Sequence, residues 1–112
     1  MNFEIFIFGI LILLFDIPFI TFIMAPMYQN IGLAKNTKII FALCAYFIMI
    51  SSWFLIKGDL INAALIGFGI YGTYAFTLAA ILPGYTLSMG LIELIWGTLL
   101  YVLATFLTNK LK

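Results

Sequence analysis

Two acidic side chains inside long apolar runs are the residues of this chain most able to do chemistry. Asp16 and Glu93 each interrupt a stretch that is otherwise almost wholly hydrophobic. An ionised carboxylate near the centre of a bilayer costs about 2.5–3.5 kcal/mol on insertion scales. We therefore expect both acids to face inward, where they could share a proton or take turns with a cation. The alternative is that they are structural and hydrogen-bond across helices.

The two acids are expected at the same depth. Asp16 lies about 4 Å past the middle of the run 3–24, and Glu93 about 6 Å before the middle of the run 87–107, at 1.5 Å per residue. Opposed helices would bring these two positions to one level. Tyr46, Tyr74 and Thr77 are predicted to reach the same layer and to complete a polar site, with close helix packing as the alternative reading.

Small residues recur along the third and fourth apolar runs. One face of the run 60–82 carries small or hydroxyl-bearing side chains every three or four positions, and the run 87–107 repeats the pattern. Such stripes let membrane helices approach closely. The residues predicted to pack in this way are Gly69, Gly72 and Thr73 in the third run and Gly90, Trp96 and Gly97 in the fourth.

The elements that must position these residues follow from composition. The chain has 112 residues, of which 66% are hydrophobic and 8% are charged, and its mean hydropathy is +1.26. A soluble domain has roughly 25% charged residues, so a soluble enzyme, a nucleic-acid binder and a disordered linker are excluded. Four runs, 3–24, 39–56, 60–82 and 87–107, are long enough to approach or exceed the span of a bilayer.

The expected fold is all-α, an integral membrane bundle of four antiparallel helices that forms a single domain over residues 1–112. Helices satisfy their own backbone hydrogen bonds in lipid, and the short second and third connections require antiparallel neighbours. Both termini then share one side with Lys57, Lys110 and Lys112, against Lys35 and Lys38 on the other. This lysine bias favours cytoplasmic termini, and we expect the chain in a bacterial inner membrane.

The residue types also limit the chemistry. Histidine is absent, and Cys44 is the single cysteine, so the sequence predicts no metal site, no cofactor and no nucleophile–base pair of an enzyme. All five basic residues are lysines and the net charge is +1, so no nucleic-acid partner is expected. The expected partners are the lipid bilayer and either a second copy of the chain or a larger membrane protein.

Several short motifs together resemble a known family. They are Asp16 late in the first run, Met27-Tyr28-Gln29 before the first loop, Ala45-Tyr46, Gly72-Thr73-Tyr74 with Thr77, and Glu93 followed by Trp96-Gly97-Thr98. The chain resembles small bacterial membrane proteins grouped as a domain of unknown function. This resemblance implies the four-helix topology and no activity. The chain departs from the family pattern at Ala75 and Leu78, where Asp and Asn are typical, and at Glu93, where Asp is typical.

Two classes of function remain open. The first is a transporter coupled to protons or cations, in which Asp16 and Glu93 bind the ion while Tyr46 and Tyr74 orient them. Its plan resembles that of small multidrug exporters, which work as dimers around an acid in the first helix. The second is a structural or accessory subunit that binds a larger membrane protein or lipid through the small-residue faces.

Overall fold

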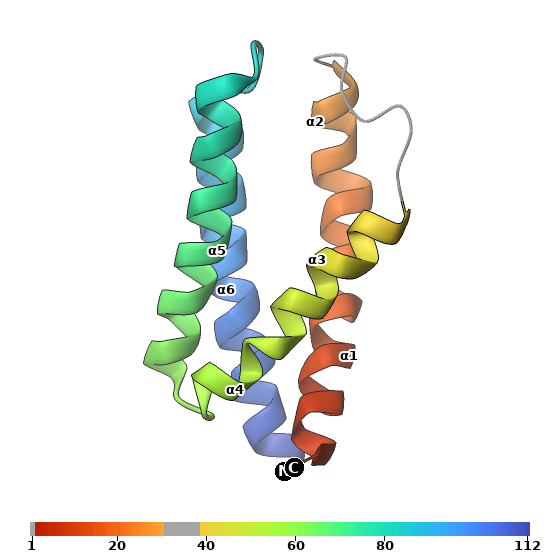
Figure 1. Ribbon diagram of the computed structural model, residues 1–112, viewed down its shortest axis with the longest axis vertical. Helices are drawn as coiled ribbons and strands as arrows, with labels where there is room; N and C mark the ends of the chain where they lie inside the picture. Colours follow the sequence, from red (N-terminus) through yellow and green to blue (C-terminus); the bar gives the residue numbers. More distant parts are fainter. Residues whose placement is uncertain (1, 31–38) are drawn as a thin grey trace.

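The computed structural model describes residues 2–30 and 39–112, and all regular structure within these two stretches is helical (Figure 1). Four helical rods result, because the first and second each consist of consecutive segments. The elements are α1 (Asn2–Phe19), the π-helix η1 (Ile20–Met24), α2 (Ala25–Asn30), α3 (Ile39–Ser51), α4 (Trp53–Ile56), α5 (Leu60–Ile81) and α6 (Leu87–Leu111).

The rods have the length and surface of membrane helices, which confirms the predicted fold class. Three stretches, Phe3–Met27, Leu60–Ile81 and Leu87–Leu111, are long and apolar enough to cross a bilayer, and Ile40–Ile56 is a shorter apolar helix. Large apolar side chains such as Phe6, Phe22 and Phe47 point outward, as lipid contact requires. The shorter helix α3 crosses the front of the bundle obliquely, whereas α5 and α6 run side by side (Figure 1).

Polar caps set where the α5–α6 hairpin begins and turns. The Asp59 carboxylate accepts a hydrogen bond from the Ile61 amide at 2.8 Å, and the Thr86 hydroxyl accepts one from the Met89 amide at 3.2 Å. Both are N-cap contacts that satisfy amides at a helix start. At the other end of α6, the Asn109 side-chain amide donates to the Gly58 carbonyl at 2.9 Å and so ties the α4–α5 turn to the last helix.

A row of small residues on α5 holds α5 against α6. Ala63, Gly67 and Ala75 are buried, and they lie at multiples of four residues, on one face. A Cβ added to Gly67 would lie 2.5 Å from the Gly97 carbonyl oxygen. The two backbones therefore meet at Gly67 and Gly97, as in small-residue contacts between membrane helices.

The predicted packing residues divide accordingly. Gly72 and Gly90 do face neighbours, since added Cβ atoms would lie 3.1 Å from Leu94 and 3.8 Å from Ala75. Gly69 and Thr73 do not pack within this chain, because both are exposed and Gly69 has open space around it. Within this chain the neighbouring stripe, which begins at Ala63, is the one that meets α6, and packing of Gly69 and Thr73 against another molecule stays a prediction.

Three predicted helix boundaries also change. The first rod continues past Met24 to Asn30, because the backbone stays helical from the π-helix through Ala25 into α2, of which Pro26 is the second residue. The second rod is interrupted at Ser52. The fourth extends to Leu111, one turn beyond the prediction. Lys35 and Lys38 lie outside the described residues.

An aromatic cluster fills the bundle near the termini. Phe8 is fully buried, with its ring centroid 4.9 Å from that of Trp53 and 5.9 Å from that of Tyr101. Ile12 and Leu100 are also fully buried in this cluster. This buried apolar cluster thus lies between the middle of the bundle and its terminal end.

The α5–α6 contact generates a test with a matched control. Gly67→Ala should lower the free energy of unfolding of the detergent-solubilised protein by about 1–3 kcal/mol, and with it the melting temperature, because the new methyl group meets the backbone of Gly97. Gly69→Ala makes the same chemical change where nothing lies within 4 Å, and its melting temperature should stay the same or rise slightly. Equal melting temperatures for the two variants would contradict this packing.

A candidate polar site around Asp16

Asp16 lies inside the bundle, on the inner face of α1. Its side chain is 1% exposed, while its neighbours Leu14 and Ile17 are 61% and 50% exposed to the outside. The apolar face of the first rod therefore points toward lipid while its single mid-span carboxylate points toward the other helices. The inward direction removes the group from lipid but also from water, so it needs partners within the protein.

Three donors from three other helices supply those partners. The Tyr46 hydroxyl of α3 donates to Oδ2 of Asp16 at 2.8 Å. The Tyr71 hydroxyl of α5 and the Trp96 indole N–H of α6 both donate to Oδ1, each at 2.9 Å. A carboxylate only accepts hydrogen bonds, and bonds to an ionised acceptor are the stronger kind. One side chain thus joins all four rods.

Close packing places two of these donors. A Cβ on Gly97 would lie 2.1 Å from Cγ of Tyr71, so the Tyr71 ring occupies the space that any larger residue at position 97 would take. The Trp96 ring stacks on Phe19, with centroids 4.6 Å apart and planes 9° from parallel. Gly97 and Phe19 therefore fix the directions in which the Tyr71 hydroxyl and the Trp96 indole point.

The second acid has its own aromatic partner. Glu93 is 4% exposed and accepts a hydrogen bond from the hydroxyl of Tyr85, which is 6% exposed and belongs to the α5–α6 turn. Glu93 precedes Trp96 by three residues on α6, about 4.5 Å along the helix axis. The two carboxylates therefore accept from different side chains, and whether they share a proton stays a prediction.

Of the tyrosines and the threonine predicted for the site, Tyr46 is the one that contacts Asp16. Tyr74 is 47% exposed and Thr77 is also exposed, and the donor from α5 is Tyr71 instead. Tyr71 and Tyr74 lie at similar depth but about 60° apart around the helix. Tyr71 falls in the same four-residue row as Ala63 and Gly67, and this spacing is the sequence signal that could have identified it.

Trp96 and Tyr85 also contact the two acids, although the sequence analysis did not place either residue in the polar site. Trp96 was predicted as a packing residue, and it both packs on Phe19 and donates to Asp16. Tyr85 was not among the predicted site residues. Tyr85 follows the Pro83-Gly84 turn, and the sequence pattern does not show that this turn folds the Tyr85 side chain back over the first turns of α6, where it contacts Glu93.

The surroundings of Asp16 do not resemble a metal centre. In the described stretches, no group of three His, Cys, Asp or Glu side chains gathers where it could hold a metal ion. The groups around the Asp16 oxygens present hydrogens to them. A cation at this point would have to displace those donors.

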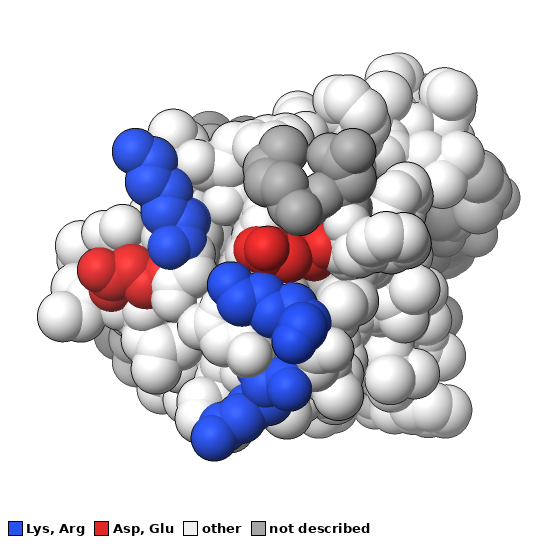
Figure 2. Space-filling view, turned by 90° about the horizontal axis from the view of Figure 1, so that it is seen from below, with Lys and Arg blue, Asp and Glu red and all other residues white. Residues whose placement is uncertain are grey.

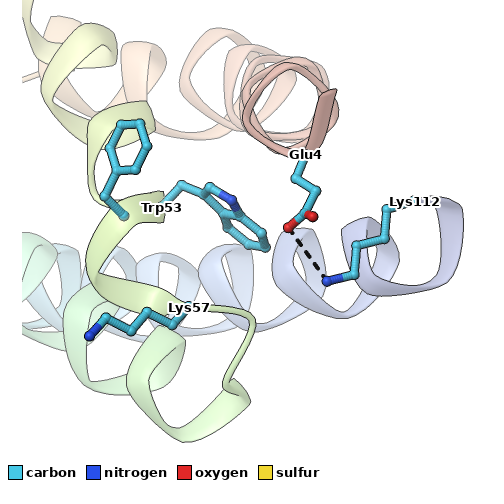
Figure 3. A pocket seen from close by; sticks show the side chains of 5 residues that line it. Glu4, Trp53, Lys57 and Lys112 are labelled. Atoms are coloured by element: carbon cyan, nitrogen blue, oxygen red, sulfur yellow. Dashed lines mark hydrogen bonds and ion pairs between the residues drawn. The ribbon is translucent and has the colours of Figure 1, made fainter. Parts of the chain in front are cut away.

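The two remaining acids, Glu4 and Asp59, lie near the terminal end of the bundle and contrast with the buried site around Asp16. Seen from below, lysine and acidic side chains gather on the end face (Figure 2). There Lys112 pairs with Glu4 at 3.4 Å beside a shallow pocket of about 250 Å³ that Trp53, Phe54 and Lys57 also line (Figure 3). The Lys112 and Glu4 side chains of this pair are 41% and 27% exposed, so the pair is of the screened, surface type.

Removal of a single donor tests the Asp16 cluster. Tyr71→Phe keeps the ring against Gly97 but deletes the hydroxyl that donates to Asp16, and it should destabilise the protein by about 1.5–3 kcal/mol, as expected for a hydrogen bond to a charged group. Tyr74→Phe is the comparison, one turn away on α5 and half-exposed. The measurement is thermal unfolding in detergent. A larger loss of stability for Tyr74→Phe than for Tyr71→Phe would contradict the assignment.

Comparison with known proteins agrees with this architecture. No curated protein and no solved structure matches the chain. A family model described as a predicted membrane protein, DUF2177, matches residues 2–109 and so includes all four rods, Asp16 and Glu93. This confirms the resemblance seen in the sequence motifs: the chain belongs to the DUF2177 family of predicted membrane proteins, whose function is unknown.

Proposed function

We propose that the protein is a proton-coupled membrane transporter in which Asp16 is the group that binds the proton. The observation that carries this proposal is the fully buried Asp16 carboxylate held by donors from α3, α5 and α6. Ionisable residues inside membrane segments commonly mark ion pathways and proton relays. The family match supports the membrane location alone.

The use of an acid is the reason to favour a proton-linked role. A neutral amide side chain could link helices without the cost of a buried charge. A carboxylate can change its charge, and with it the number of hydrogen bonds that it accepts. Protonation of Asp16 would weaken its bonds to Tyr46 and Tyr71, so that α3 and α5 could shift relative to α1. Proton binding and helix movement would then be coupled at the Asp16 carboxylate.

The geometry favours a proton over a metal cation at this site. Both Asp16 oxygens already face O–H or N–H donors. A proton needs only one lone pair and a small rearrangement of those donors. A bare cation needs several oxygen ligands, and it would be repelled by the hydrogens that now point at the carboxylate.

The test is flux in reconstituted vesicles. A pH gradient across proteoliposomes should drive exchange of protons for one of a panel of organic and inorganic cations. Asp16→Asn keeps the size of the side chain and one acceptor but cannot titrate, so it should reduce the flux to the level of empty vesicles. Equal flux for Asp16→Asn and the wild type, or no flux with either, would contradict transport.

Asp59→Asn supplies the matched control, since it makes the same change at the exposed N-cap of α5, where Asn caps a helix as well as Asp does. Its flux should equal that of the wild type. A loss of flux in both variants would point to a general effect of removing negative charge and would contradict a specific role of Asp16.

A second candidate function is an accessory subunit bound to a larger membrane protein. It is favoured by one observation: Gly69, Thr73 and Thr77 on α5 are exposed, and a Cβ added at Gly69 would meet no atom within 4 Å. Small residues on a lipid-facing helix would let a partner helix approach closely. Photo-crosslinking from position 73 in native membranes should then recover one constant partner, and recovery of this chain alone would contradict the accessory role.

We also propose that the terminal end faces the cytoplasm of a bacterial cell, with the chain in the inner membrane. Lys57, Lys110 and Lys112 lie at this end, and lysines near short loops are retained on the cytoplasmic side. Fusion of a reporter enzyme to the C-terminus, active only in the cytoplasm, should give full activity.

A further inference from the structure

The two sides of Asp16 along the bundle axis differ in whether they carry a second buried acid. On the side toward the termini, Phe8, Ile12, Leu100 and Tyr101 are each 0% exposed and packed together. The Tyr101 hydroxyl donates to the Met49 carbonyl at 3.2 Å. Hydroxyl groups such as those of Ser52, Tyr101 and Thr105 are also buried on this side, but no buried acid lies there among the described residues.

The opposite side, toward the α5–α6 turn, carries the second buried acid. Glu93 lies one helical turn from Trp96, the α6 donor to Asp16, and accepts a hydrogen bond from Tyr85 of the turn itself. Tyr85, Glu93 and Trp96 therefore follow one another from the turn toward the middle of the bundle. Glu93 can hold a proton, and Tyr85 and Trp96 donate hydrogen bonds that orient the two carboxylates.

The backbone of the first rod changes on this side as well. Pro18, two residues beyond Asp16, has no N–H to donate to the carbonyl of Leu14. The helix then widens into the π-helix Ile20–Met24, where the Ala25 amide donates to the Ile20 carbonyl. Such π-segments often occur at functional sites. The regular α-helix on the terminal side, before Asp16, contains no proline.

From this asymmetry we infer that protons reach Asp16 from the side of the α5–α6 turn alone, with Glu93 as the relay acid and Tyr85 as its positioning residue. The inference rests on the proposed role of Asp16 and adds a direction to it. The ionised Glu93 takes a proton from water at the turn side and passes it to the Asp16 carboxylate, after which Glu93 is ionised again. Tyr46 and Tyr71 face Asp16 from α3 and α5, and Tyr85 faces Glu93.

Trp96 is a built-in reporter for this transfer, because its indole donates to Asp16 and its fluorescence should change when Asp16 is protonated. The chain has two tryptophans. The Trp53→Phe variant leaves Trp96 as the sole indole, and Trp96→Phe, which retains Trp53, gives the background signal. Both are reconstituted into vesicles of phosphatidylethanolamine and phosphatidylglycerol, and the external pH is lowered in a stopped-flow instrument.

The orientation of the molecules is measured independently. In a Cys44→Ala background, Lys112→Cys is labelled by a membrane-impermeant maleimide only when the terminal end faces outward. In preparations whose labelled fraction differs from one half, the fast fluorescence phase should equal the unlabelled fraction. A fast phase equal to the labelled fraction, or one that includes all molecules, would overturn the inference while Asp16 remained a proton site. Absence of any Trp96 response after both sides have equilibrated would instead overturn the proposed function.

Variants of the relay acid complete the test. Glu93→Gln should slow the fast phase at least about tenfold, and Glu93→Asp should restore most of the rate. Glu4→Gln, at the terminal end, should leave the rate unchanged. An unchanged rate in Glu93→Gln would overturn the relay role, and the sidedness measured with the Glu93 side chain intact does not depend on whether Glu93→Gln folds.

Discussion

A carboxylate placed in the middle of a membrane bundle has to be compensated by other side chains, and this requirement organises the molecule. Asp16 is 1% exposed, and its oxygens accept hydrogen bonds from Tyr46, Tyr71 and Trp96. Because these donors come from α3, α5 and α6, a single acid on α1 fixes the positions of all the other rods. The oblique helix α3, which packs mainly on α1, gains in Tyr46 a polar contact that apolar surfaces in lipid could not supply.

The α5 donor Tyr71 reaches Asp16 because two glycines let the backbones of α5 and α6 approach each other. Gly67 faces the Gly97 carbonyl, and Gly97 makes room for the ring of Tyr71. Polar and apolar contacts are therefore coupled. A side chain at position 97 would displace Tyr71 and with it a hydrogen bond to Asp16. The small residues contribute to the site by geometry and not by chemistry of their own.

The fold could be predicted from the sequence because length and apolarity alone decide which segments span a bilayer. The inward direction of Asp16 also followed, from the cost of a charge in lipid. The sequence did not show that Tyr71 and not Tyr74 donates to Asp16, or that Gly69 and Thr73 lie off the α5–α6 contact, and the reason is the same for both. The hydrophobic pattern of α5 is nearly uniform around the helix, so it does not indicate which of two adjacent stripes faces α6. That choice depends on the fit of Gly67 and Tyr71 to Gly97, a contact between segments 26 to 30 residues apart in the chain.

The hydrogen bond from Trp96 to Asp16 can be observed directly by the indole ¹H–¹⁵N resonances of the protein in micelles, since Trp53 and Trp96 give one signal each. The Trp96 proton should resonate downfield, as a strongly hydrogen-bonded group does, and Asp16→Asn should move it upfield while the Trp53 signal stays in place as a reporter of the fold. A Trp96 signal that is the same with and without the Asp16 carboxylate would contradict the claim that this acid joins the helices.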